Sequence, residues 1–175
     1  MKRVTYLLMC VLVIGMTPWA WAQEKQKISF KGLAENFKYT QQHEIAVGDV
    51  PGHLIRISEG RRTFPTNPPV FDGVKAVEAW TRLSSDFIDG TGRVSGYTIF
   101  VLENGDKIFG RVDGATHLVA NPDGTTKGNA TSVTTLTGGT GRFRGIRGVL
   151  RNVVAANIRG GVIESQTDGE YWIEK

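Results

Sequence analysis

Cysteine is almost absent from this 175-residue chain. The single one, Cys10, lies in an apolar run near the N-terminus that we expect to be removed. The remaining chain then has no thiol for a disulfide, a nucleophile or a Cys-ligated metal site.

A strong charge of either sign is also lacking. The chain has 21 Lys and Arg against 17 Asp and Glu, and the two signs are interleaved. Loss of Lys2 and Arg3 with the leader would lower the formal net charge from +4 to about +2. Nucleic-acid binding favours basic residues gathered on one face, so we predict no nucleic-acid partner.

No apolar run reaches the roughly 20 residues that cross a bilayer. The shorter run Val4–Met16 follows Lys2 and Arg3 and precedes Ala20-Trp21-Ala22. Small residues at the first and third positions of that triplet are typical of a signal-peptidase site. We therefore predict a signal peptide at 1–22, a single mature domain at 23–175, an exported (periplasmic or secreted) location and no stable membrane anchor.

Few residues of the chain are suited to catalysis or to metal binding. His43, His53 and His117 are not spaced as metal ligands, and Gly92–Gly96 holds its serine one position away from a nucleophile elbow. We identify no catalytic residue and predict neither a metal nor a cofactor.

Glycine, by contrast, is abundant, with 22 residues, and turn signals recur at the spacing of a β-meander. Further turns are marked by Asn121–Gly124 and by Gly160-Gly161. Two structures are compatible with the sequence of residues 28–42: an extra strand followed by a loop, or a short helix near Leu33–Phe37. Eight strands are predicted between the turns: His43–Val47, His53–Phe64, Val74–Ile88, Val94–Glu103, Lys107–Val119, Thr126–Thr137, Gly148–Ile158 and Val162–Glu174. A meander of long strands removes its exposed edges by closing, so we expect an all-β, eight-stranded antiparallel barrel.

Asn104-Gly105 between two apolar runs is a strong hairpin signal. A two-residue type I′ turn would pair Val101 with Ile108. One face, expected to point into the lumen and to contact a ligand, would then consist of Tyr97, Ile99, Val101, Ile108 and Val112. The outer face would pair Phe100 with Phe109, which indicates a second buried surface, either a subunit interface or a surface covered by a docked N-terminal segment.

Alternation in Val74–Leu83 leaves two arrangements open. Either Glu78 and Trp80 face the lumen and form a ligand site with Arg82, or Val77, Ala79 and Leu83 face the core and Trp80 lies at an interface.

A glycine-rich segment from residue 138 to residue 148 is the most specific local pattern. It lacks the Lys-Ser/Thr of a P-loop and the third glycine of a dinucleotide fingerprint, so we interpret it as a barrel corner shaped by its backbone. Phe143 is expected to plug the nearby barrel end. The residues that carry the pattern are Gly138, Gly139, Thr140, Gly141, Phe143, Gly145 and Gly148.

This pattern resembles a signature of plant allene oxide cyclases, and most of it is similar to dirigent proteins. The resemblance implies an eight-stranded, calycin-like meander barrel that associates as trimers and has a lumen for a small hydrophobic molecule. It carries no catalytic residue with it. Together with the Phe100/Phe109 pair, the resemblance predicts a homo-oligomer, a trimer or a dimer, joined through the outer face of the Asn104-Gly105 hairpin.

Three functions follow as alternatives. The first is non-catalytic binding of a small hydrophobic molecule in the lumen. The second is an isomerase or cyclase similar to the plant enzyme, which would need a polar group such as Glu78 inside the lumen. The third is a structural or partner-binding module with a filled barrel.

Overall fold

The computed structural model describes residues 24–120, 126–157 and 162–174. Within these ranges the chain is all-β, apart from the short 3-10 helices η1 (Ala34–Asn36) and η2 (Gly141–Phe143). The predicted signal peptide and the turns at 121–124 and 160–161 lie outside the described residues. No helix in the described ranges is long and apolar enough to cross a membrane.

Each of the eight predicted strands is present, and the described residues add two short ones. The strands are β1 (Gln26–Gly32), β2 (Phe37–Ala46), β3 (His53–Thr63), β4 (Val70–Phe71), β5 (Val74–Ile88), β6 (Thr91–Leu102), β7 (Lys107–Ala120), β8 (Thr126–Gly139), β9 (Ile146–Asn157) and β10 (Val162–Ile173). The open segment 28–42 contains both an extra strand, β1, and a single helical turn, η1.

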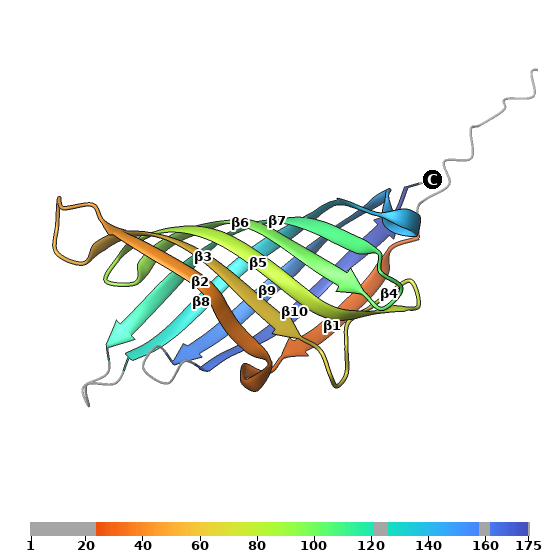
Figure 1. The fold of residues 1–175 in the computed structure, drawn as a ribbon, viewed down its shortest axis with the longest axis horizontal. Helices are drawn as coiled ribbons and strands as arrows, with labels where there is room; N and C mark the ends of the chain where they lie inside the picture. Colours follow the sequence, from red (N-terminus) through yellow and green to blue (C-terminus); the bar gives the residue numbers. More distant parts are fainter. Residues whose placement is uncertain (1–23, 121–125, 158–161, 175) are drawn as a thin grey trace, which may run out of the picture.

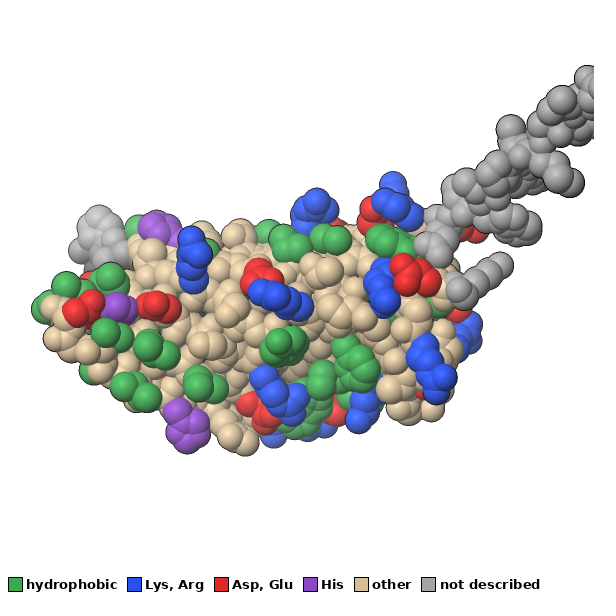
Figure 2. Space-filling view, turned by 90° about the horizontal axis from the view of Figure 1, so that it is seen from above, with side chains coloured by type: hydrophobic (Ala, Val, Ile, Leu, Met, Phe, Trp, Pro, Cys, Tyr) green, Lys and Arg blue, Asp and Glu red, His purple; other side chains and the backbone are tan. Residues whose placement is uncertain are grey.

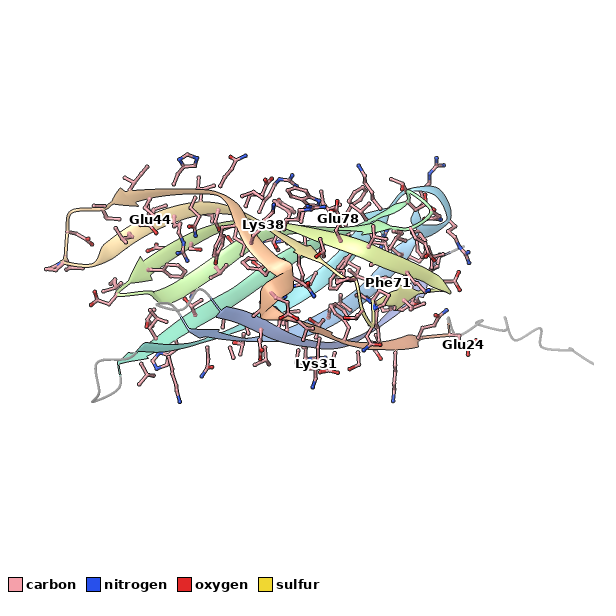
Figure 3. The ribbon with its side chains drawn as sticks, turned by 60° about the horizontal axis from the view of Figure 1, so that its bottom comes forward. Glu24, Lys31, Lys38, Glu44, Phe71 and Glu78 are labelled. Carbon is pink, nitrogen blue, oxygen red and sulfur yellow. The ribbon has the colours of Figure 1, made fainter. Side chains whose placement is uncertain are left out.

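The strands form one antiparallel meander in the order β1-β10-β9-β8-β7-β6-β5-β3-β2, and β4 pairs with β5. They run side by side at a tilt to the long axis (Figure 1). The sheet curls, so that β1 with Lys31 lies opposite the strands with Glu44 and Glu78 (Figure 3). The two edge strands, β1 and β2, are consecutive in the chain and are joined only by residues 33–36.

The predicted register of the β6–β7 hairpin is wrong by one residue. Phe100, not Val101, pairs with Ile108. The amide of Gly105 donates to the Leu102 carbonyl at 2.9 Å, and Gly105 has φ +85°. The loop is therefore a three-residue type, with a turn followed by a left-handed glycine, rather than a two-residue turn.

This slip moves the side chains of β6 to the opposite faces. Tyr97, Ile99 and Val101 face outward, and Tyr97 is 65% exposed. Phe100 is buried in the core, so the predicted outer Phe100/Phe109 pair does not exist.

A β-bulge at Val77 makes both predicted arrangements of β5 wrong in part, because Val77 is 45% exposed whereas Ala79 is buried. Ala76 pairs with Leu102 but Glu78 pairs with Val101, which leaves Val77 as the extra residue. The bulge reverses the alternation, so Ala76 and Ala79 are both buried. Glu78 and Trp80 consequently lie on the outer face.

Large side chains fill one end of the curled sheet. Tyr171 is held there by two hydrogen bonds of 2.6 Å, one received from the Asp72 amide and one donated to Gln26 Oε1. This closed end has the following fully buried side chains: Phe71, Leu102, Ile108, Leu136, Phe143, Ile146, Leu150 and Tyr171.

The glycine motif forms the corner between β8 and β9 and contacts the β6–β7 hairpin. The Lys107 amide donates to Thr140 Oγ1 at 2.8 Å, and the Thr140 amide donates to the Lys107 carbonyl at 2.8 Å. Gly141 has φ +50°, and Phe143 is completely buried. These contacts agree with the architectural interpretation of the motif.

Replacing Gly141 should destabilise the protein for two reasons. A left-handed backbone costs a residue with a Cβ about 1–2 kcal/mol, and at this position a Cβ would also lie 2.1 Å from Asp106 Oδ1. Gly48 has φ +86° and open space around it, so Gly48→Ala measures the backbone cost alone. We expect Gly141→Ala to lower the free energy of unfolding more than Gly48→Ala in urea titrations. Equal losses would contradict a role for the Asp106 contact.

Phe143→Ala should lower the free energy of unfolding by about 3–5 kcal/mol, because it removes a fully buried ring and leaves a cavity. Chemical denaturation measures this loss. Arg142→Ala is the neighbouring control, since the Arg142 side chain is half exposed and pairs with Asp72 at the surface. A loss below about 1 kcal/mol for Phe143→Ala would contradict its role as the plug of the closed end.

Candidate functional site

Next to the filled end, the concave face of the sheet encloses a cavity of about 660 Å³. Every strand of the long sheet contributes to its wall, from Phe30 on β1 to Thr167 on β10. The cavity exists because many inward positions carry small side chains. Along β8, for example, Ala130, Ser132 and Thr134 line the wall.

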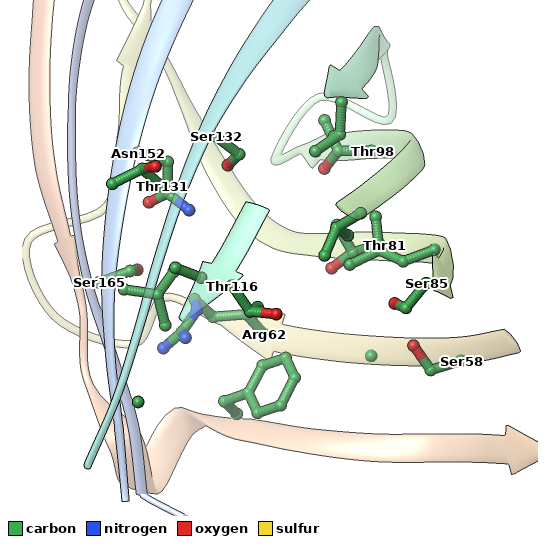
Figure 4. Close-up of a pocket in the computed structure, with 18 of the residues that line it drawn as sticks. Ser58, Arg62, Thr81, Ser85, Thr98, Thr116, Thr131, Ser132, Asn152 and Ser165 are labelled. Atoms are coloured by element: carbon green, nitrogen blue, oxygen red, sulfur yellow. The ribbon is translucent and has the colours of Figure 1, made fainter. Parts of the chain in front are cut away.

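The wall changes in character along the cavity. Phe30 lies edge-on to Phe64 and Phe100, with ring centroids 5.9 and 6.1 Å apart, and these rings border the filled end. Leu54 and Phe87, paired across β3 and β5, line the opposite end, which we call the mouth. Between them, hydroxyl and amide groups surround the space (Figure 4): Ser58, Thr81, Ser85, Thr98, Thr116, Ser132, Asn152 and Ser165.

Two arginines also line the cavity. Arg62 is only 9% exposed, and its Nη1 donates to the Leu33 carbonyl at 2.5 Å. Arg56 lies nearer the mouth, with its guanidinium 5.0 Å from the Phe87 ring centroid and 3.7 Å from Glu44. Arg56 Nε is buried and has no hydrogen-bond partner among the described residues.

Of the predicted lumen residues, only Val112 lines this cavity. Ile108 is buried in the closed end, while the slipped register turns Tyr97, Ile99 and Val101 outward. The sequence interpretation missed Arg62 and the hydroxyl-bearing wall. The alternation of small residues in β8 was the available signal for the wall.

Glu78 and Trp80 belong to an ion-pair cluster on the outer face. Trp80 Nε1 donates to Glu78 Oε1 at 2.8 Å, and Arg61 contacts Glu78 Oε2 at 2.5 Å. The guanidinium groups of Arg61 and Arg82 lie over the Trp80 ring, at 5.5 and 5.9 Å from its centroid. The hydrogen bond from Trp80, and secondarily Arg61, lowers the pKa of Glu78. Glu78 is therefore placed to stabilise the sheet and does not face the cavity.

Near the mouth, His53 bridges two carboxylates. Its Nδ1 lies 2.6 Å from Asp49 in the β2–β3 loop, and its Nε2 lies 2.8 Å from Asp86 on β5. Hydrogen bonding to Asp86, and then to Asp49, raises the pKa of His53, and the bond from His53 lowers the pKa of Asp49. Among the described residues, no group of three or more His, Asp or Glu side chains is placed to hold a metal ion.

Comparison of the chain with protein-family models, with curated proteins and with solved structures finds no match.

The His53 bridge should make the β2–β3 loop sensitive to pH. The raised pKa of His53 means that its contribution is complete below the ordinary value of 6.5 and is lost as pH rises through the folded-state pKa. The lowered pKa of Asp49 means that its contribution is complete above 3.8 and is lost as pH falls below that value. The loop should thus be most stable between pH 3.8 and pH 6.5.

Amide hydrogen exchange of residues 47–53, corrected for intrinsic rates, measures this stability. We expect protection to fall as the pH rises above 6.5 in the wild type and to stay constant over the same range in His53→Gln. His43→Gln is the control, and it should retain the wild-type dependence. An identical pH profile in His53→Gln would contradict the bridge.

Proposed function

We propose that this protein binds one small, mainly apolar molecule in the cavity and does not transform it. The observation that carries the proposal is the cavity itself, whose volume of about 660 Å³ is within the range of small-molecule sites. Aromatic and aliphatic side chains at its two ends would contact an apolar body. The hydroxyl groups between them would orient any polar substituents.

We also propose that the sheet acts as a closed barrel around this molecule, as the resemblance to allene oxide cyclases and dirigent proteins implies. The support is the short connection between the edges: β1 and β2 are separated by only four residues. Arg62 on β3 reaches Leu33 in this connection, so the two sides of the sheet contact each other where it would close.

The position of Glu78 favours binding over the isomerase alternative, because the polar group on which that alternative depended lies on the outer face. The size of the cavity favours binding over a module with a filled interior.

Export and self-association are parts of the same proposal. Export is supported by the sequence pattern of residues 1–22. Self-association is supported by exposed apolar side chains on the outer face, among them Ile45 (69% exposed) and Ile57 (61% exposed). Apolar side chains and histidines gather at the end of the molecule that holds the β2–β3 loop (Figure 2). This surface replaces the Phe100/Phe109 pair as the candidate interface.

The neutral fluorescent probe N-phenyl-1-naphthylamine tests the binding proposal. We expect saturable fluorescence enhancement with the wild type. Thr134→Phe, which fills part of the cavity, should weaken binding about tenfold or more. Thr135→Phe is the matched control, because Thr135 is exposed on the other face of the same strand.

Both variants must retain wild-type circular dichroism for this comparison. No enhancement with the wild type, or equal weakening in the two variants, would contradict binding in the cavity.

A further inference from the structure

A row of polar side chains crosses three neighbouring strands of the cavity wall. Asn152 on β9 pairs directly opposite Ser132 on β8 and Thr167 on β10. All three residues line the cavity, and Figure 4 shows Asn152 and Ser132 on the same part of its wall. Directly opposite side chains of antiparallel strands lie about 5 Å apart. The row therefore brings one amide and two hydroxyl groups together.

One hydrogen bond within this row fixes the amide of Asn152. The Thr167 hydroxyl donates to Asn152 Oδ1 at 2.9 Å, and Thr167 is only 6% exposed. A side-chain amide has one oxygen that accepts and one nitrogen that donates. Because the oxygen already accepts from Thr167, the nitrogen is the group left to make a further bond. No described residue accepts a hydrogen bond from this nitrogen.

Aromatic surface adjoins the row on β1. Thr167 pairs with Phe30, whose ring lies edge-on to Phe64 and Phe100 at the border of the filled end. A ligand whose oxygen atom reaches the Asn152 amide can thus place its ring or chain against these phenylalanines.

Charged side chains of the described wall are confined to two strands. They are Glu44 on β2, and Arg56 and Arg62 on β3. Arg56 lies 3.7 Å from Glu44, and Arg62 donates to the Leu33 carbonyl. On the other strands, no described residue that lines the cavity is charged. A charged ligand group beside Asn152 would therefore lose its water without an oppositely charged partner on β8, β9 or β10, which is costly.

We propose that the cavity selects an uncharged ligand with a carbonyl oxygen, and that the amide nitrogen of Asn152 donates a hydrogen bond to this oxygen. The proposal rests on the proposed binding function and specifies its ligand class. A ligand without an acceptor would leave the amide nitrogen unpaired in a site from which it has displaced water, at a cost in free energy. Asn152 thus distinguishes a ketone from a hydrocarbon of the same shape.

Two competitors of the same shape test the role of Asn152. We would measure displacement of N-phenyl-1-naphthylamine by 2-acetonaphthone and by 2-isopropenylnaphthalene, which differ only in an oxygen atom against a methylene group. Asn152→Leu removes the donor and approximately keeps the side-chain volume. The ratio of the two affinities should shift about tenfold against the ketone in this variant, because its oxygen loses its donor. An unchanged ratio in the folded variant would overturn the inference while leaving the binding function intact.

Gln41→Leu is the matched control. It makes the same change, from an amide to an apolar side chain, at an exposed position of β2 that does not line the cavity. We expect this variant to retain the wild-type ratio. A shift as large as that of Asn152→Leu would contradict a hydrogen bond from Asn152 to the ligand.

Thr167→Val is the second variant, should Asn152→Leu fail to fold. It removes the hydroxyl that fixes the amide and keeps the shape of the side chain. Since the Asn152 amide is then free to turn its oxygen toward the ligand, the ratio should shift about threefold against the ketone. An unchanged ratio in folded Thr167→Val would likewise overturn the inference.

A third competitor, 2-naphthoate, tests the absence of charge on the ligand. At pH 7 it should bind the wild type at least tenfold more weakly than 2-acetonaphthone, because its carboxylate is ionised and must lose its water. Binding as tight as that of the ketone would overturn the uncharged class. No displaceable binding of N-phenyl-1-naphthylamine by the wild type would instead overturn the binding function.

Discussion

The fold depends on one short connection, residues 33–36, because the strands before and after it pair with different strands of the sheet. Residues 26–32 pair with β10, and after the single turn at Ala34–Asn36 residues 37–46 pair with β3. One short segment therefore supplies both edges of the long sheet. Arg62 holds this junction through the Leu33 carbonyl and the Phe37 ring. The sheet must curl for both pairings to form, and the curl creates an interior.

Side-chain size then divides that interior into a filled part and a hollow part. One end is closed by aromatic rings that are almost completely buried, those of Phe71, Phe143 and Tyr171. Beyond them many of the inward positions carry serine, threonine, alanine or glycine, whose side chains are too small to meet across the sheet. Close packing at one end supplies the core that a domain of this size needs. The hollow end can consequently remain unfilled.

Charged groups also differ in their surroundings from the outer face to the interior. The Glu78–Arg61–Trp80 cluster lies outside, where water screens its charges and its contribution to stability is modest. Arg62 lies inside, where a charge is costly to bury. The His53 bridge lies at the mouth, between the outer cluster and the interior. It connects the β2–β3 loop to β5.

Local patterns in the sequence determined the all-β class, all eight predicted strands and the glycine corner with its buried Phe143, because turns and alternation act over a few residues. Only the tertiary structure decided which face of each strand points inward. One extra residue in the Glu103–Gly105 loop and one at Val77 reverse the faces that simple alternation predicts. Most of the predicted lumen residues therefore lie elsewhere. Arg62, Ser165 and Gly32 come together only through pairing between distant strands, which no short stretch of sequence specifies.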